Sequence, residues 1–343
     1  MKTTTIKDVA KEAGVSISVV SYVLNNNPNV SISKETREKV LDAAKRLNYT
    51  PNRIAQSMRT KKSMIIGLAT FWDISDSVFT DVLKGVDEVV GQKGYSVTYC
   101  NITNNFNPSK IIELYNQKQI DGVILLLHVD PAKSFNEIEF INSIKSVKIP
   151  AVVIDGSTED PDMSYVYIDY YGTTYSAVSY LHKLGHRKFC YMLPDEHEIN
   201  HRQALQRLSG YKDALKYLNL EDSGLYFNKK SVYDIIELID SSSPANRPSA
   251  IVVNKTSYAA YLLRAFIEHG IRVPDDVSVI ACNDQNIADF LIPPLTTIKV
   301  PTYEIGQKSA DILFDILQGK SQNIKLKLSN KVIERGSCKN FIV

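Results

Sequence analysis

Seven short apolar runs, rich in β-branched residues, recur between residues 63 and 284, and helical stretches such as FTDVLKGVDEVVGQKG, TYSAVSYLHKLGH and AAYLLRAFIEHG separate them. This alternation predicts parallel sheets with helices on both faces. Neither a G-x-G-x-x-G sequence nor a Walker phosphate loop is present, so a nucleotide-cofactor enzyme is unsupported and we expect no cofactor. The seven predicted strands are SMIIGLAT, GYSVTYCNI, DGVILLLHV, PAVVIDG, KFCYMLP, SAIVVN and VSVIACND.

The first 49 residues have a helical pattern instead. The first predicted helix has Thr5 as its N-cap and ends at Gly14, the second follows Ser16, and the third starts at Ser33. The turn between the first two helices is short and contains glycine, which is typical of a small all-α helix-turn-helix domain. Its predicted core consists of Ile6, Val9, Ala10, Ala13, Val20, Val23, Leu24, Val40, Leu41, Ala44 and Leu47.

Charge is distributed unevenly along the chain. Residues 1–62 contain 12 Lys and Arg against 5 Asp and Glu, a net charge of +7, whereas the remainder carries 28 basic and 33 acidic residues, a net charge of −5. A basic head suggests a polyanion as its partner. In a helix-turn-helix, the N-terminal residues of the second helix enter the DNA major groove. The pattern alone also allows a small helical bundle with a solvated polar face. The predicted exposed face of the second helix contains Ile17, Ser18, Ser21, Tyr22 and Asn25.

Specific motifs in the head favour DNA binding. The stretch TIKDVAKEAGVSISVVSYVLNN resembles the N-terminus of the lactose-repressor (LacI) family of bacterial transcription regulators, and SKETREKVLDAAKRLNYTPNRIAQSM is similar to the family's third helix and hinge helix. Val19 and Tyr22 stand where family members commonly carry Thr and Arg, so we expect an unusual DNA half-site. The resemblance implies a double-stranded DNA operator contacted by Thr5, Ser16, Ile17, Ser18, Ser21, Tyr22, Asn25, Asn52, Arg53, Ala55 and Met58.

The segment after the third helix is read as a hinge. Residues 52–58 are too few for a stable isolated helix. The resemblance implies that this segment folds when two copies lie in the minor groove, where Met58 occupies the position of the family's wedge leucine. A flexible basic linker off DNA is compatible with the same sequence.

The resemblance extends over the whole chain, through QIDGVILL, YLHKLGHRKFCYM, QRLSGYKDAL, IRVPDDVSVIACND and IPPLTTIKV. It implies an α/β periplasmic-binding-protein-like sensor of two doubly wound parallel-sheet lobes with a ligand between them. The expected domains are a headpiece at 1–49, a hinge at 50–62 and an effector-binding and dimerisation domain at 63–343. The last divides into an N-lobe of about 63–165 and 301–328 and a C-lobe of about 166–300 and 329–343.

Ligands in such sheets bind beyond the carboxyl ends of the strands. Polar groups, one arginine and flanking aromatic rings there suit a hydroxyl-rich or anionic molecule, and we expect a carbohydrate-type effector. The ring of Trp72 is suited to stacking on the face of a sugar, but a packing role in the core or in a dimer interface fits it equally well. Lys255 and Asn283 replace acidic residues common in the family, which favours a phosphorylated or carboxylated ligand or simply another sugar. The expected effector-binding residues are Phe71, Trp72, Phe79, Asp155, Arg207, Asn254 and Asn283.

The stretch DEHEINHRQ contains an H-E-x-x-H sequence, His197 to His201. On a helix this spacing binds zinc in many peptidases. Its flanks are polar and no third ligand is evident, so we interpret it as a cleft loop in which His201 and Arg202 help to bind an anion. We expect no metal, no catalytic residues and no enzymatic activity, with a zinc hydrolase as a remote alternative. A cation at His186 would suit a helix C-terminus, and we expect this residue to be structural.

The four cysteines form no CxxC pair and suggest reduced thiols. The N-terminus lacks a signal-peptide pattern and no apolar run could span a bilayer, so a cytoplasmic protein with no membrane partner is expected. The helix-turn-helix head and the missing signal peptide argue against a periplasmic binding protein. The expected function is a homodimeric transcriptional repressor with a sugar-like effector, and the absence of a leucine-heptad tail favours the dimer. A co-repressed or activating regulator with a non-sugar effector is the alternative.

Overall fold

A computed structural model describes residues 4–24, 30–49, 62–71, 74, 77–102, 107–127, 135–196, 198–243, 247–320 and 323–341. The chain divides into two compact units, Met1–Ser63 and Met64–Val343. No described helix is long and apolar enough to cross a membrane.

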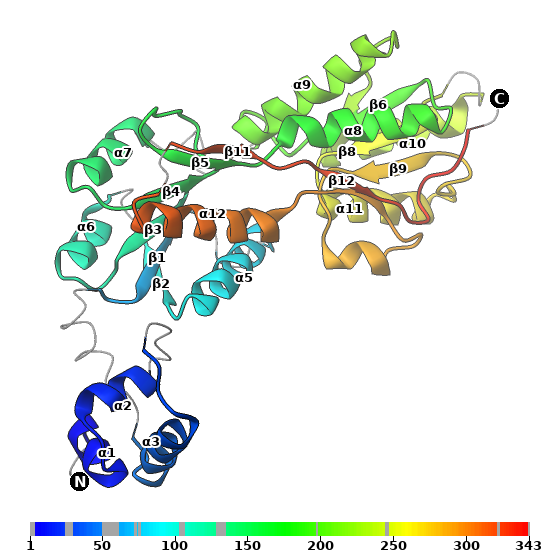
Figure 1. The fold of residues 1–343 in the computed structure, drawn as a ribbon. Coiled ribbons are helices and arrows are strands. Elements are labelled where there is room, and N and C mark those ends of the chain that lie inside the picture. Colours follow the sequence, from blue (N-terminus) through cyan, green and yellow to red (C-terminus); the bar gives the residue numbers. More distant parts are fainter. Residues whose placement is uncertain are drawn as a thin grey trace. The chain divides into compact units, whose positions relative to one another are not determined.

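The described part of the N-terminal unit contains three helices, α1 (Ile6–Ala13), α2 (Ile17–Leu24) and α3 (Lys34–Arg46) (Figure 1). Gly14 ends α1, as predicted, and holds the left-handed conformation at φ 65°. The amides of Val19 and Thr36 donate to the hydroxyls of Ser16 and Ser33, so each serine caps the helix that was predicted to start there. The core contains Val9, Ala10, Val20, Val23, Val40, Ala43 and Ala44.

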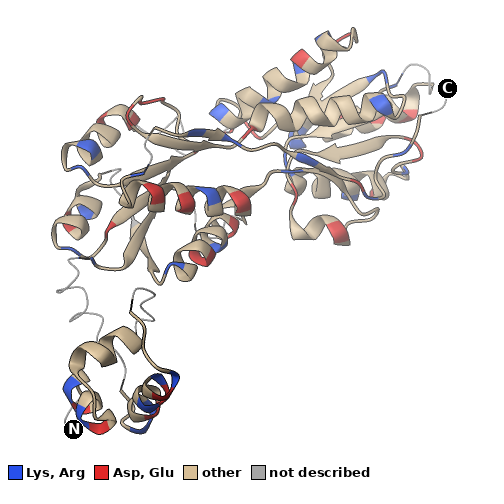
Figure 2. Ribbon diagram, viewed as in Figure 1, with Lys and Arg blue, Asp and Glu red and all other residues tan. Residues whose placement is uncertain are grey.

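Leu41 was predicted in this core, and that prediction is wrong. Its side chain is 46% exposed, whereas Ala43 is fully buried. Positions 40, 43, 44 and 47 share one helical face, and Leu41 lies beside that face. Charge is also distributed by helix, because Lys and Arg mark α1 and α3 whereas α2 carries no charged residue (Figure 2).

The described part of the C-terminal unit forms two sheets of six strands each. The first lobe has the strand order β11-β5-β4-β3-β1-β2, and all its neighbouring strands are parallel. The second lobe has the order β12-β10-β9-β8-β6-β7, parallel except for the β10–β12 pair. The strands are β1 (Ile65–Thr70), β2 (Ser96–Asn101), β3 (Gly122–Leu126), β4 (Ala151–Ile154), β5 (Ser164–Tyr167), β6 (Phe189–Met192), β7 (Tyr226–Phe227), β8 (Ala250–Val253), β9 (Ser278–Ala281), β10 (Thr296–Lys299), β11 (Lys325–Lys327) and β12 (Lys331–Ile333).

Helices cover both faces of each sheet (Figure 1). In the first lobe, Ile124 and Leu126 of β3 pack in the core beneath α5 and α12, whereas Val123 and Leu125 pack in the core beneath α6 and α7. Successive side chains of a strand point to opposite faces, which is why the predicted strands are apolar throughout. These helices are α5 (Ser77–Gln92), α6 (Ser109–Asn116), α7 (Glu137–Ser146) and α12 (Thr302–Leu317).

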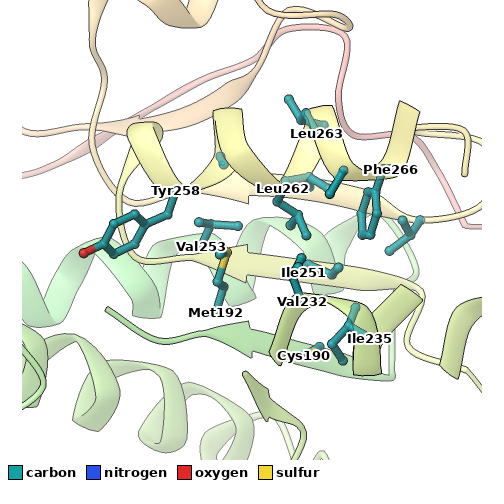
Figure 3. Packing of buried hydrophobic residues seen from close by; sticks show 14 of the residues in the cluster. Cys190, Met192, Val232, Ile235, Ile251, Val253, Tyr258, Leu262, Leu263 and Phe266 are labelled. Atoms are coloured by element: carbon teal, nitrogen blue, oxygen red, sulfur yellow. The ribbon is translucent and has the colours of Figure 1, made fainter. Parts of the chain in front are cut away.

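The second lobe repeats this arrangement. Ile251 and Val253 of β8 face the core beneath α10 and α11, where Leu262 and Phe266 lie over the strands in Figure 3. Ala250 and Val252 face α8 and α9. Helices of this lobe are α8 (Tyr170–Lys183), α9 (Arg202–Tyr217), α10 (Val232–Ser241) and α11 (Thr256–Glu268), with short 3-10 helices η1 (Lys229–Ser231) and η2 (Asn286–Phe290).

Glycines allow two helix pairs to pack backbone against backbone. A β-carbon at Gly85 of α5 would collide with the carbonyl oxygen of Tyr303 in α12, and one at Gly306 with that of Val82. At the α8–α9 contact, a β-carbon at Gly210 would meet the carbonyl oxygen of Tyr171. Each close approach therefore excludes any side chain larger than hydrogen.

The fold class predicted from the sequence, a helix-turn-helix unit followed by two α/β lobes, is confirmed. All seven predicted strands are present, as β1 to β4, β6, β8 and β9. All four cysteines are free thiols.

Candidate nucleic-acid interface and ligand site

The predicted DNA-contacting face of α2 is partly confirmed as a surface. Ile17 and Tyr22 are exposed by 44% and 37%, and Ser18 is also exposed. Ser21 was predicted on this face but is buried, with 6% exposure, because it lies on the same side as Val20. The remaining surface offers an apolar side chain, a hydroxyl and a phenol in place of charge, which suits base edges and methyl groups better than phosphates.

Two flanking candidates already have local roles. The amide and hydroxyl of Thr5 both donate to the carboxylate of Asp8, at 2.8 and 2.7 Å. The exposed Ser16 hydroxyl accepts from the amide of Val19 at 3.3 Å. Both residues therefore define the starts of helices at the surface. The candidates Asn25, Asn52, Arg53, Ala55, Met58 and Trp72 lie outside the described residues.

In the C-terminal unit, Asp155 follows β4 directly and holds the left-handed conformation at φ 57°. Its carboxylate accepts a 2.8 Å hydrogen bond from the hydroxyl of Tyr170, which in turn accepts one of 2.8 Å from the side chain of Gln203. Arg202 donates to the carbonyl of Gly156 and lies 3.9 Å from Asp155. These bonds connect the first lobe to α8 and α9 of the second.

A small cavity of about 50 Å³ lies within this network. Residues of both lobes line it: Leu127, Phe135, Glu137, Asp155, Ser157, Tyr170, Arg202 and Gln203. Burial raises the pKa of Asp155 to about 7, despite the opposing effects of the Tyr170 hydrogen bond and the Arg202 charge. Glu137 is also buried, and its carboxylate accepts bonds from the amides and hydroxyls of Ser157 and Thr158.

Arg207, on α9, is buried, with 4% exposure. Its guanidinium donates to the side-chain oxygen of Asn254 and to the carbonyl of Cys282, both at 3.2 Å. The same group lies over the ring of Tyr170, 5.0 Å from its centroid. The arginine is therefore held at the carboxyl ends of β8 and β9, one aromatic ring away from the cavity.

Two other predicted ligand residues hold protein groups in this structure. Asn254, 1% exposed, fixes Arg207 with its oxygen and donates to the hydroxyl of Tyr191 at 3.0 Å. The side chain of Asn283 accepts from the amide of Thr256 at 2.7 Å and so satisfies the N-terminus of α11. Both residues thus position the site as well as border it.

The aromatic candidates differ from each other. Phe71 is half-buried, and its ring meets that of Phe135, a cavity residue, with centroids 4.7 Å apart. Phe79 was predicted to contact the ligand, but it is 4% exposed in the core between α5 and its sheet. In this structure Phe79 therefore acts as a packing residue of that core.

The H-E-x-x-H stretch is not helical in its described residues. Glu198 to Asn200 form a turn, and α9 starts only at Arg202. The carboxylate of Glu198 accepts bonds from Lys255 at 2.8 and 2.9 Å and from the hydroxyl of Tyr258 at 2.8 Å. That hydroxyl points away from the α11 core in Figure 3. His197 lies outside the described residues, and among those described no group of three His, Cys, Asp or Glu is placed to hold a metal ion.

His186 has a structural role, as expected, but its imidazole is buried, which disfavours the cation expected from its place after α8. Burial lowers the pKa of its imidazole to about 4. Its ring nitrogens lie 2.9 Å from the hydroxyl of Ser249 and 3.1 Å from the carbonyl of Lys339, so it joins three segments of the second lobe.

Three functional candidates, Tyr170, Gln203 and Glu137, were not predicted. Tyr170 is the first residue of α8 and lies shortly after β5, a short strand that was not predicted. Had that strand been recognised, the rule of searching beyond strand ends would have found the tyrosine. Glu137 and Gln203 lie at helix starts far away in sequence, and no local pattern distinguishes them.

Comparison with known proteins agrees with this architecture. Residues 5–52 match the family described as bacterial regulatory proteins, lacI family, and residues 178–338 match a periplasmic binding protein-like domain. The transcriptional regulator RegA of Clostridium acetobutylicum is 31% identical, over 97% of this chain and 99% of its own. A lac repressor dimer bound to operator and an anti-inducer superposes with TM-score 0.73 at 25% identity, covering 98% and 100% of the two chains. A complex of the regulator CelR with cellobiose has TM-score 0.64 at 26% identity, covering 97% and 99%.

Proposed function

The chain belongs to the LacI family of DNA-binding transcription regulators, and we propose that it acts as a homodimeric repressor of a pseudo-palindromic operator under the control of a sugar-like effector. The proposal rests on two features that one chain combines. The start of α2 in the N-terminal unit is exposed and uncharged, and the C-terminal unit has a polar cavity between its two lobes. A read-out surface and a ligand site on one chain are the two parts that a ligand-controlled regulator needs.

For DNA binding, α2 is the recognition helix and Ile17, Ser18 and Tyr22 face the bases. Ile17 offers an apolar surface for a thymine methyl group, and the Ser18 hydroxyl hydrogen-bonds to a base or a phosphate. Tyr22 cannot make the bidentate guanine contact of an arginine, so the half-site differs from those read by arginine at this position. Met58 of each hinge wedges the central minor groove.

For dimerisation, the second lobe offers an apolar surface. Ile287, Phe290 and Ile292, in and after η2, are exposed by 49%, 81% and 75%. Arg335 holds this segment through ion pairs with Asp284 at 2.9 Å and Asp289 at 2.6 Å. A rigid apolar surface of this kind favours association, and a second copy of the chain suits the two-fold symmetry of a palindromic operator. The lac repressor named above is itself a dimer on its operator.

For effector binding, hydrogen-bonding groups converge from both lobes on one cavity, and Asp155, Ser157 and Gln203 suit the hydroxyl groups of a carbohydrate. The solved structure of CelR is a complex with cellobiose, which supports a sugar-type ligand in this fold. A ligand that binds one arrangement of the lobes more tightly increases the population of that arrangement. If the two arrangements differ in DNA affinity, the ligand thereby changes DNA binding.

The test is selection of bound sequences from a random duplex library with purified full-length protein and no ligand. A two-fold symmetric site of about 16–20 base pairs is expected, because each subunit reads one half-site. An asymmetric site would contradict the dimer, and no enrichment would contradict ligand-free repression in favour of a co-repressed regulator.

A matched pair of substitutions assigns the DNA surface. Tyr22→Ala should lower affinity for the selected operator about tenfold, since one base contact is worth roughly 1–3 kcal/mol. Tyr233→Ala removes an exposed tyrosine from α10 in the second lobe and should leave operator affinity unchanged. Equal affinities for the two variants would show that α2 does not read bases.

A further inference from the structure

We infer that the effector carries a negatively charged group, a phosphate or a carboxylate, and that Arg207 is its counter-ion. This inference rests on the proposed effector function and specifies the chemistry of the ligand.

The surroundings of Arg207 carry the argument. The side chain is buried, yet its partners are the amide oxygen of Asn254, the carbonyl of Cys282 and the ring of Tyr170, all of them neutral. Among the described residues no carboxylate forms an ion pair with its guanidinium. Its Nε is buried and has no hydrogen-bond partner among those residues.

A buried cation without a counter-charge is unfavourable, because it has lost its hydration and gained only dipoles in return. Arginine presents its donors as a planar fork that matches the two oxygens of a carboxylate or phosphate. An anionic ligand group would supply the missing charge and use the donor that now has no partner. A neutral sugar would supply only dipoles, which Arg207 already has.

Nearby acidic residues are engaged elsewhere. Glu198 is paired with Lys255, and Asp284 with Arg335. Asp155 lies on the first-lobe side, bound to Tyr170 and 3.9 Å from Arg202. These ion pairs therefore do not neutralise Arg207, and its positive charge is available to a ligand.

The helices around Arg207 add to the positive potential. Arg207 lies in the second turn of α9, whose first turn contains no acidic residue. α11 begins two residues after Asn254, a partner of Arg207, and its first turn also contains no acidic residue, although the neutral side chain of Asn283 accepts from the amide of Thr256. Helix N-termini carry a partial positive charge that proteins usually complement with Asp or Glu. Two termini without such residues, beside a buried arginine lacking a counter-ion, favour an external anion.

The cavity gives the ligand a direction. Glu137 and Asp155 both lie on its first-lobe side, whereas Arg202 and Arg207 come from α9 of the second lobe. The anionic group therefore belongs at the α9 side and hydroxyl groups at the Asp155 side. Sugar phosphates and sugar acids both have this polarity.

The experiment measures Tm of the full-length protein without DNA, at constant ionic strength, in inorganic phosphate and in chloride. Glucose 6-phosphate, gluconate and glucose are then compared as phosphate, carboxylate and neutral probes. We expect inorganic phosphate to raise Tm by about 3 °C near ten times its dissociation constant. Whichever anionic sugar gives the larger rise identifies the preferred anion.

Variants assign the effect to its residue. Arg207→Gln should lose the rise, and Arg207→Lys, which keeps the charge without the fork, should retain part of it. Arg264→Gln removes an exposed arginine from α11 and should retain all of it. The lysine variant keeps the test decisive if the glutamine variant fails to fold.

Three results would overturn the inference: no rise in phosphate, a rise that survives in Arg207→Gln and so reflects adventitious anion binding, or a rise with glucose alone. None of them affects operator selection, which needs no ligand. Conversely, failure to select an operator would leave a phosphate-dependent Tm intact, so the two proposals fail separately.

Discussion

Replacing Asp155 by asparagine should change how stability depends on pH. The folded-state pKa of Asp155 is about 7, above the ordinary 3.8, because burial disfavours the charged carboxylate. The folded protein thus retains a proton that the unfolded chain releases. The contribution to stability is fully present below pH 4 and is lost as the pH rises towards 7. Asparagine does not titrate, and it tolerates the left-handed backbone at this position.

The magnitude follows from the two pKa values. A difference of about three units corresponds to about 4 kcal/mol between the extremes of pH, since each unit is worth about 1.4 kcal/mol. About 2.5 kcal/mol of this should be lost between pH 5 and pH 8. The free energy of unfolding of Asp155→Asn should therefore rise by that amount relative to the unchanged protein over the same range.

The assay is denaturant unfolding of the protein and the variant at each pH, and the quantity compared is the difference between them. That difference is needed because His186 acts in the opposite direction: its pKa, lowered to about 4, makes the folded state gain stability as the pH rises to about 6.5. Asp276→Asn is the control, because Arg272 lowers the pKa of Asp276 to about 2 and its effect should be constant above pH 5. A constant difference for Asp155→Asn would refute the reasoning.

Four further outcomes are expected. Gly85→Ala should lower the free energy of unfolding by about 1–3 kcal/mol, because the added methyl group meets the carbonyl of Tyr303; unchanged denaturation would show that α5 and α12 separate freely. Phe290→Asp should shift sedimentation towards a monomer, and a persistent dimer would place the interface elsewhere. Tyr22→Arg should change the selected half-site, and the same site would mean that Tyr22 does not face bases. Met58→Gly should weaken operator binding in a mobility-shift titration and leave effector binding intact, whereas full operator affinity would exclude the wedge.

Strands were predictable from the sequence when both faces are buried. β3 and β8 are continuous apolar runs for that reason, and they were found. β11 and β12 have the sequences KLK and KVI, lie at sheet edges and carry lysines, so a composition rule misses them. The error at Leu41 has the opposite origin, because its apolar character predicted burial, but its place on α3 is at the surface.

The site was predictable in position but only partly in its contacts. Searching beyond strand ends found Asp155, Asn254 and Asn283, yet two of these now hold Arg207 and α11. Lys255 was interpreted as a cation available to a ligand, but Glu198, 57 residues earlier in the chain, pairs with it. Such a pairing depends on how a loop lies over a helix, and no local spacing encodes that geometry.

The size of the cavity bears on how a ligand could control this protein. At about 50 Å³ it is far smaller than the roughly 300–1,000 Å³ of typical small-molecule sites, so under the proposed function a ligand of that size would separate groups that now touch. Those groups join the lobes through Arg202 and Gly156, through Gln203 and Tyr170, and through Gln285 and Ser77. The free energy by which a ligand would favour an arrangement with the lobes further apart is the free energy of the contacts it makes minus that of the contacts it breaks. Arg207 has no ion pair to break among the described residues, so an anion gains there without an offsetting loss, and ligand charge is the property best suited to select between the two arrangements.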